Sequence, residues 1–286
     1  MEWLWITGFG PVGGPLPPRR APRLLWWSDH QTEETHKVVQ GLKVSLFITC
    51  LADHFYPEVG EAVVHLLRRY GCEVDFPPNQ TCCGQPAWNT GLEDEAKAYA
   101  RAYIETFEQS EYVVMPSGSC AGHVRYFYPQ MFKDDKEMFR RACAVADKTY
   151  EFSEFMVKVL KVKDVGARFP ATVVFHNNCH MQRELGVKEE PLELLRHVKD
   201  LVLVDNPRYD LCCGFGGAFS VKMPEISTAM ADERLGIYAA TQADIIVSCD
   251  GGCLMHMGGR AEREGLPMKT MHLATLLWEG VRNNGR

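Results

Sequence analysis

Two adjacent cysteine pairs, each followed by glycine, are the residues in this chain best suited to bind a metal or to carry out redox chemistry. The pairs are Cys82-Cys83-Gly84 and Cys212-Cys213-Gly214, and each lies in the middle of a longer series of cysteines. Thiolates gathered at one place act as ligands of a metal ion or cluster, or as redox partners. The two motifs therefore predict two sites of thiolate chemistry.

The two cysteine series have nearly the same spacing. The first has 31 residues before its pair and 36 after it, whereas the second has 32 and 35 and then a further cysteine after three more residues. A single shift along the chain superimposes the series to within one position, which predicts a duplicated ligand site. The candidate ligands are Cys50, Cys82, Cys83 and Cys120 in the first series, and Cys179, Cys212, Cys213, Cys249 and Cys253 in the second.

The number of thiols in each series limits what it can bind. Four thiolates satisfy a tetrahedral zinc ion or one ordinary iron–sulfur cluster. The second series has five thiols, more than a [4Fe–4S] cluster takes, so it predicts an unusual cluster or one spare, redox-active thiol. The first series predicts a cluster or a structural zinc ion, and His123 is the nearest polar residue to the place of its missing fifth cysteine.

Several neighbours of the cysteines are expected to support the ligands. Gly84 and Gly214 allow the backbone to approach a bulky inorganic group. His176 and His180 flank Cys179, and each can hydrogen-bond a sulfur atom or move a proton, with a purely structural role as the alternative. Ligation is favoured over thiol–disulfide exchange, because the chain has no Cys-x-x-Cys motif and adjacent cysteines rarely bridge without strain.

Length and composition indicate a cytoplasmic α/β protein. The chain has 286 residues, of which 46% are hydrophobic, and this is enough for one large domain or two of ordinary size. A net charge of -6 argues against a nucleic-acid-binding protein. Eleven cysteines in a chain of this length are more typical of metal-binding or catalytic thiols than of a disulfide scaffold. No stretch approaches the roughly 18 apolar residues of a membrane helix.

The segment 1–42 differs in composition from the rest of the chain. It holds four of the six tryptophans and five prolines, and it shows no periodic pattern. The ordered pattern begins abruptly at Lys43. We therefore expect residues 1–42 to be a disordered leader and interpret the true start as lying near Leu42, with a genuine but flexible extension as the alternative.

The remaining sequence predicts two tandem Rossmann-like β-α-β units with parallel sheets, related by internal duplication. In each copy one strand ends at or just before the first ligand cysteine, and a later strand runs straight into another cysteine. Ligands at the carboxyl ends of parallel strands fall on one edge of the sheet. The strands are expected at 44–48, 73–76 and 112–115 in the first copy, and at 172–175, 201–204 and 245–247 in the second.

The two predicted domains are residues 43–163 and 170–286. Residues 134–161 are expected to form a long helical segment that joins the copies, and residues 164–170 are the expected boundary. The long helical segment is interpreted as packing rather than chemistry.

The cysteine pattern resembles the duplicated cysteine-rich CCG domain found in heterodisulfide reductase and in the glycolate oxidase iron–sulfur subunit. The resemblance covers residues 43–280, and at this length the chain is most similar to the lactate-utilization members of that family. Two departures stand out: the first copy has His123 where the family has a second cysteine, and the second copy spaces its last two cysteines by three residues. The motifs are Cys82-Cys83-Gly84, Ser117-Gly118-Ser119-Cys120, His176-Asn177-Asn178-Cys179-His180, Cys212-Cys213-Gly214 and the seven residues 249–255.

The resemblance implies iron–sulfur binding, with a cluster of the [4Fe–4S] type at the second repeat and a second cluster or zinc at the first. It implies an electron-transfer subunit that takes part in oxidising L-lactate to pyruvate with two companions, a ferredoxin-like iron–sulfur protein and a third protein. On this interpretation the chain alone does not oxidise lactate. Two alternatives remain open: a thiol or disulfide reductase of the heterodisulfide-reductase type, and a non-redox binding module stabilised by zinc.

Overall fold

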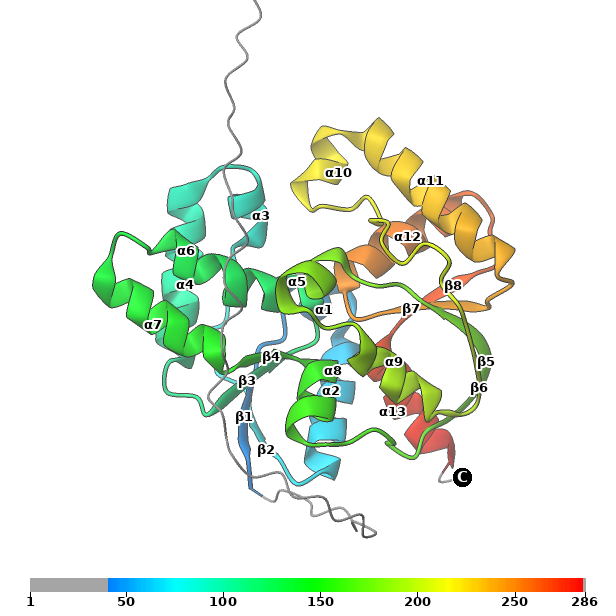
Figure 1. Cartoon of the computed structure of the whole chain (residues 1–286), viewed down its shortest axis with the longest axis horizontal. Helices are drawn as coiled ribbons and strands as arrows, with labels where there is room; N and C mark the ends of the chain where they lie inside the picture. The colour runs from blue at the N-terminus through cyan, green and yellow to red at the C-terminus, as the bar shows by residue number, and fades with distance from the viewer. Residues whose placement is uncertain (1–40, 285–286) are drawn as a thin grey trace, which may run out of the picture. The chain divides into compact units, whose positions relative to one another are not determined.

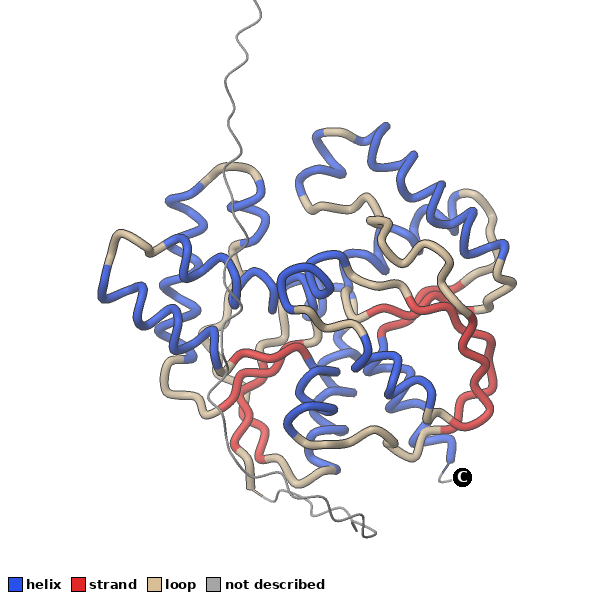
Figure 2. Tube along the Cα trace, viewed as in Figure 1, coloured by secondary structure: helices blue, strands red, loops and turns tan. Residues whose placement is uncertain are grey.

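Each half of the described chain contains one sheet of four short parallel strands (Figure 2). The computed structural model describes residues 41–284, so residues 1–40 of the predicted leader lie outside it. The predicted α/β class and the duplication are confirmed, because both sheets have the same strand order, β2-β1-β3-β4 and β6-β5-β7-β8. The strands are β1 (Lys43–Leu46), β2 (Glu73–Asp75), β3 (Tyr112–Met115), β4 (Thr149–Glu151), β5 (Arg168–Phe175), β6 (Lys199–Val204), β7 (Ile245–Ser248) and β8 (Lys269–His272).

The register of the central strands shows which residues correspond in the two halves. Leu46 of β1 pairs with Val114, and Phe175 of β5 pairs with Val247. The next residue in each half, Phe47 or His176, donates its backbone N–H to the carbonyl of that same valine. Cys50 and Cys179 each follow three residues later, so both sheets deliver a cysteine to the same place at their carboxyl edge.

Helices follow the strands in the same order in both halves (Figure 1). In the first half they are α1 (Cys50–Phe55), α2 (Pro57–Arg69), α3 (Gln85–Asn89), α4 (Glu93–Phe107), α5 (Gly118–Gly122), η1 (His123–Phe127), α6 (Tyr128–Met131), α7 (Lys136–Asp147), α8 (Phe152–Glu154) and η2 (Phe155–Val159). In the second half they are η3 (Met181–Leu185), α9 (Glu189–Arg196), α10 (Ala218–Lys222), α11 (Pro224–Ala240), α12 (Gly251–Arg263) and α13 (Leu273–Asn284).

The segment expected to be one long helix over residues 134–161 is broken by a strand. Helix α7 ends at Asp147, and β4 then pairs with β3 through Val113 and Thr149, Val114 and Tyr150, and Met115 and Glu151. Tertiary pairing overrides local helix propensity here, since Thr149 and Tyr150 suit a strand that packs on a sheet. The expected boundary over 164–170 also overlaps β5, which begins at Arg168.

The two halves share a hydrophobic core. The largest cluster of buried side chains draws on both sheets and includes Val44 and Leu46 of β1 together with Val173 and Phe175 of β5. Helix α2 packs against α13, and the rings of His65 and Trp278 stack there at 4.5 Å. Burial of this shared apolar surface holds the two thiol-bearing edges in a fixed relation. Within residues 41–284, no helix has the length and apolar character that crossing a membrane requires.

Candidate metal centre

One cavity of about 210 Å³ is lined by cysteines from both repeats. Its other lining residues include the apolar side chains of Leu51, Pro86 and Phe215 and the polar side chains of Asn178 and His180. The two cysteine series, which lie far apart in the sequence, therefore face one common space. The cysteines that line it are Cys50, Cys82, Cys83, Cys120, Cys179, Cys212, Cys213 and Cys253.

The first set of thiols forms two close pairs. The Sγ atoms of Cys50 and Cys82 are 3.8 Å apart, and those of Cys83 and Cys120 are 3.4 Å apart. Cys50 begins α1 directly after β1, whereas Cys82 and Cys83 lie in the loop between β2 and α3. Cys120 is the third residue of α5, a helix that Ser117 caps at its N-terminus by accepting from the Cys120 N–H.

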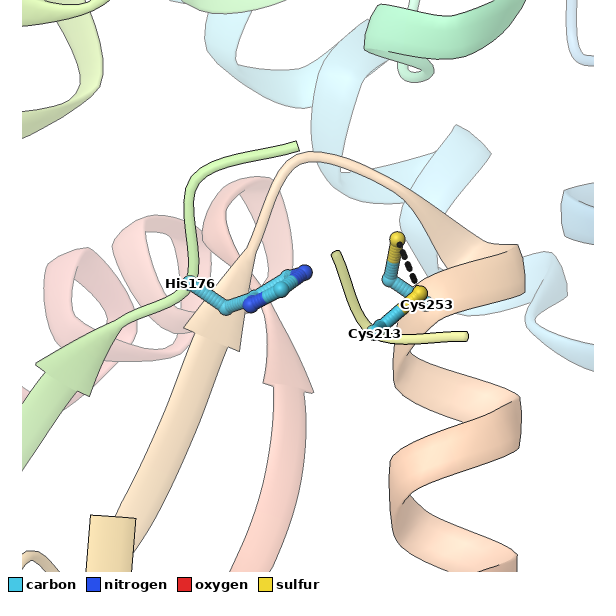
Figure 3. A group of neighbouring side chains, drawn as sticks. All are labelled: His176, Cys213 and Cys253. Atoms are coloured by element: carbon cyan, nitrogen blue, oxygen red, sulfur yellow. Dashed lines mark hydrogen bonds between the residues drawn. The ribbon is translucent and has the colours of Figure 1, made fainter. Parts of the chain in front are cut away.

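The second set repeats this arrangement. The Sγ atoms of Cys213 and Cys253 are 3.1 Å apart, and the Sγ of Cys179 lies 3.6 Å from Nδ1 of His180. Cys253 is the third residue of α12, which Asp250 caps. His176 points toward the same thiols: its ring nitrogen and the Sγ atoms of Cys213 and Cys253 all lie within 4.8 Å of one another (Figure 3).

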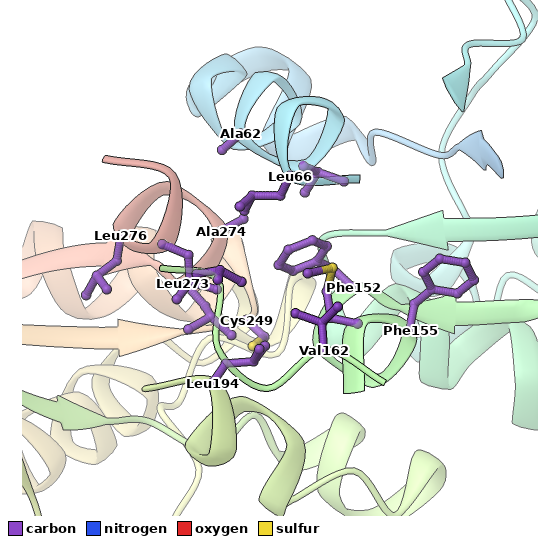
Figure 4. Packing of buried hydrophobic residues seen from close by; sticks show 14 of the residues in the cluster. Ala62, Leu66, Phe152, Phe155, Val162, Leu194, Cys249, Leu273, Ala274 and Leu276 are labelled. Carbon is purple, nitrogen blue, oxygen red and sulfur yellow. The ribbon is translucent and has the colours of Figure 1, made fainter. Parts of the chain in front are cut away.

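Cys249 is a sequence-predicted ligand that the structure does not bring to the cavity. It is fully buried in the shared core, beside residues such as Leu194 and Leu273 (Figure 4). Burial and the neighbouring Glu151 carboxyl raise the pKa of its thiol well above the usual range. A buried thiol kept neutral in this way packs as a small apolar side chain.

The helix caps correct the alignment of the two cysteine series. Ser117 and Asp250 cap equivalent helices, and Cys120 and Cys253 each follow three residues later. Cys253 is therefore the counterpart of Cys120, and the first repeat has a counterpart for every cavity-lining cysteine of the second. The alignment of Cys120 with Cys249 on spacing alone was wrong, because the segment before the second cap is longer.

This corrected alignment brings out a repeated Cys-x-x-His pattern. Cys120 is followed by His123, and Cys253 is followed by His256. Within residues 41–284, neither ring nitrogen of the fully buried His123 has a hydrogen-bond partner, and burial lowers the pKa of this ring to about 3. The Nε2 of His256 lies 3.1 Å from the Ser227 hydroxyl. The equivalence of His123 and His256 was not predicted from the sequence, although the repeated Cys-x-x-His spacing indicates it.

The glycine after each cysteine pair is required by backbone geometry. Gly84 and Gly214 have φ values of 85° and 90°, in the left-handed region that favours glycine. The backbone N–H of each lies 3.4 Å from the Sγ two residues earlier, in Cys82 or Cys212. A Cβ on Gly214 would lie 2.5 Å from the carbonyl oxygen of Ser227, and one on Gly84 would lie 2.9 Å from the Cβ of Tyr99.

One thiol in each set ionises far more readily than its neighbours. The hydrogen bond from the Cys50 thiol, followed by that from Cys83, lowers the pKa of Cys82 to about 3. In the same way Cys179, followed by Cys213, lowers the pKa of Cys212 to about 2. The same thiol–thiol contacts raise the pKa values of Cys50 and Cys179. Each set thus presents a ready thiolate, the form that binds metals.

The donor atoms suit a soft metal centre in each set. Each offers four thiols, and a backbone N–H from the following glycine is aimed at the most acidic one. Such N–H groups stabilise anionic sulfur, and soft thiolates select zinc, copper(I) or iron–sulfur clusters over hard cations. The orphaned nitrogens of His123 add a polar group beside the first set.

Comparisons with known proteins agree with the duplication. A cysteine-rich domain, CCG, matches residues 44–125 and again residues 173–258. The chain is 52% identical over 236 residues to lactate utilization protein A of Geobacillus sp. (strain WCH70). The alignment covers 99% of that relative and 82% of this chain. It is 48% identical over 240 residues to lactate utilization protein A 2 of Bacillus cereus (strain AH820), with 99% of that relative and 84% of this chain covered.

Among solved structures, a hypothetical protein from Helicobacter pylori aligns with a TM-score of 0.57. The alignment covers 86% of this chain and 52% of that chain, at 9% sequence identity. At so low an identity the likeness shows a shared fold and nothing about chemistry.

Proposed function

Because this chain belongs to the lactate utilization protein A family and carries the cysteine-rich CCG domain twice, we propose that it is the iron–sulfur electron-transfer subunit of a cytoplasmic assembly that oxidises L-lactate to pyruvate. The observation that carries the proposal is the pair of four-thiol sets on one cavity. Two metal centres that face the same cavity are better suited to passing electrons between partner proteins than to a purely structural role.

The proposed ligands are the eight cysteines that line the cavity. Each set would hold one [4Fe–4S] cluster, which takes four thiolates and supplies a site that gains and loses one electron. Hydrogen bonds from the N–H groups of Gly84 and Gly214 would stabilise the negative charge on the sulfur atoms. The apolar side chains of Leu51, Pro86 and Phe215 would limit the access of water.

The cavity itself is poorly suited to lactate. Among the described residues that line it there is no lysine or arginine to pair with a carboxylate, and Asp250 adds a negative charge. This supports the view that lactate is oxidised elsewhere in the assembly. The chain also lacks the spaced cysteine run of a ferredoxin, so a ferredoxin-like partner and a third subunit would deliver or remove the electrons.

A disulfide or thiol reductase is the second candidate, and the cavity favours it. An opening of about 210 Å³ between two thiol sets could admit a small sulfur compound as a substrate. A reductase would turn over a disulfide with a reduced dye in the absence of partners. An electron carrier would exchange electrons with the dye and leave the disulfide intact.

The decisive experiment is metal and sulfide analysis, with an EPR spectrum, of full-length protein purified without oxygen. About eight irons with matching sulfide and a reducible signal would support two clusters. Replacing Cys120 or Cys253 with serine should then lower the iron content, whereas Cys72→Ser, which changes a buried thiol outside both sets, should not.

Zinc without sulfide would overturn the proposal in favour of the zinc-stabilised module. The structure gives this outcome a physical basis, because sulfurs around one zinc lie roughly 3.8 Å apart, and the measured sulfur pairs are separated by 3.1 to 3.8 Å.

A further inference from the structure

The two thiol sets have very different surroundings, although the same fold builds both. Behind the first set lies a group of three aromatic rings. The ring centroid of Phe47 is 5.0 Å from that of Tyr103 and 5.7 Å from that of Phe107, and the last two rings are 4.7 Å apart. This group is buried and carries no charge.

Helices α4 and α11 show which residues replace this group in the second half. Gly84 abuts Tyr99 of α4, and Gly214 abuts Met230 of α11, so Tyr99 and Met230 occupy equivalent positions. The same offset along the chain relates their other glycine contacts, Ala96 and Ser227. By the same offset, Arg234 is the counterpart of Tyr103, and Tyr238 is the counterpart of Phe107. The strand register makes His176 the counterpart of Phe47.

Arg234 is a fully buried cation without a carboxylate partner. Its side chain is 0% exposed and lies 5.0 Å above the ring of Tyr238. Its guanidinium donates to the carbonyl oxygens of Arg208 and Leu211, the latter at 2.9 Å, so its hydrogen bonds go to neutral groups of the loop that leads into Cys212. No acidic group of residues 41–284 comes within 4.0 Å of it.

A buried charge is costly unless an opposite charge compensates it. The anions around it are the carboxylate of Asp210, whose pKa is lowered first by Arg208 and also by Arg234, and the thiolates of the second set. Tyr238 and His176 link Arg234 to them: the Tyr238 hydroxyl lies 2.8 Å from Nδ1 of His176, and the His176 ring lies next to Cys213 and Cys253 (Figure 3). In the first set the neutral phenol of Tyr103 stands in place of the cation, and its hydroxyl lies 3.3 Å from the hydroxyl of Thr149.

We propose that Arg234 raises the reduction potential of the second centre above that of the first, so that an electron entering the pair comes to rest at the second. The inference rests on the proposed function, since it needs a redox-active group in each set. One-electron reduction adds a negative charge, and a fixed positive charge in a low-dielectric interior stabilises the reduced form. When the electron moves, the first centre is oxidised and the second is reduced, and no bond is made or broken.

The first test uses EPR-monitored redox titration of the full chain, with dithionite as the electron donor. Cys82→Ser should keep only the second centre, and Cys212→Ser should keep only the first. The iron content of each variant confirms that one centre remains. The protein that retains the second centre should show the higher potential. Equal potentials, or a higher potential at the first centre, would overturn the inference while the iron count left the proposed function standing. Protein without iron would overturn both.

The second test assigns the difference to the charge. Arg234→Met should lower the reduction potential of the second centre by about 59 mV. For one electron, this is a roughly tenfold change in how the electron divides between the two centres. Arg234→Lys should restore most of the shift, and the potential of the first centre should stay constant in both variants. Arg260→Met is the matched control, because it removes a cation that pairs with Asp232 on the same half.

If Arg234→Met loses iron from the second set, the residue is needed for assembly. Arg234→Gln then becomes the informative variant, since it removes the charge and keeps an amide donor for the carbonyl oxygen of Leu211. A lowered second potential in that variant supports the inference, and an unchanged one contradicts it.

Discussion

Ser117 and Asp250, the N-cap residues of two equivalent helices, are hydrogen-bonded to each other where the two halves meet. The Ser117 hydroxyl donates to Oδ2 of Asp250 at 3.0 Å, and the N–H of Ser119 donates to the same oxygen at 3.0 Å. The other carboxylate oxygen, Oδ1, accepts from Gly252 of its own helix at 3.1 Å. One buried carboxylate therefore fixes the starts of both helices that carry a final cysteine.

We expect Asp250→Ala to destabilise the protein by about 3 kcal/mol, because it removes a cap and leaves two donors of the other half unpaired. Urea unfolding of the apo-protein measures this. The control is Asp135→Ala, which removes the cap of α7, a single bond to Met138 at 3.1 Å, and should cost about 1 kcal/mol. Equal losses in the two variants would contradict the bridging role of Asp250.

Gly214→Ala should destabilise the second thiol loop more than backbone conformation alone explains. The new Cβ would meet the Ser227 carbonyl, so the expected loss is roughly 3 kcal/mol, together with lower metal content. Gly91→Ala separates the two effects, because Gly91 has a similar φ of 80° and nothing within 4 Å of an added Cβ. It should cost about 1 kcal/mol and leave the bound metal unchanged.

Cys249→Ala and Cys253→Ala should behave in opposite ways. The first removes a thiol from the shared core, so the metal content should stay constant while the unfolding free energy falls by about 1 kcal/mol. The second removes a thiol that lines the cavity, so one set should lose its metal. Metal analysis of both purified variants decides between them, and loss of metal from Cys249→Ala would return that residue to the ligand set.

Glu151 should make the stability of the apo-protein fall as the pH rises. Burial raises the pKa of this carboxyl from 4.5 to about 7 in the folded chain. The folded state therefore holds the proton more tightly, and the resulting stabilisation is complete below pH 4.5 and is lost as the pH rises through 7. The shift corresponds to about 3 kcal/mol.

Glu151→Gln removes this titration and can still accept the hydrogen bond from Ser153. Its stability relative to the wild type should improve by about 2.5 kcal/mol between pH 5 and pH 8 in urea unfolding. The exposed Glu61→Gln serves as the control. A constant difference between wild type and Glu151→Gln across that range would refute the assignment.

Much of the fold could be predicted because it follows from local pattern. The buried strand over Val44 to Leu46 and the apolar face of α2 are legible in the sequence, and β3 was predicted with its observed bounds. Strand β4 was missed, since a three-residue strand directly after a helix carries almost no periodic signal. Its formation depends on pairing with β3, which is distant in sequence.

The thiol sites were predictable in kind but not in full membership. Cysteine spacing pointed to eight of the residues that line the cavity, yet it could not decide whether Cys249 or Cys253 matches Cys120. That choice depends on where a helix begins, and the caps at Ser117 and Asp250 settle it. That both sets share one cavity is a tertiary property that no spacing encodes.

The shared cavity has a consequence for ancestry. A homodimer of a single repeat would build the same cavity across a two-fold axis, but its two halves would be identical by symmetry. Such a dimer could not place Tyr103 on one side and Arg234 on the other. Joining the halves in one polypeptide frees each side to diverge. If each set holds a redox centre as proposed, electron flow between the two centres would then have a direction.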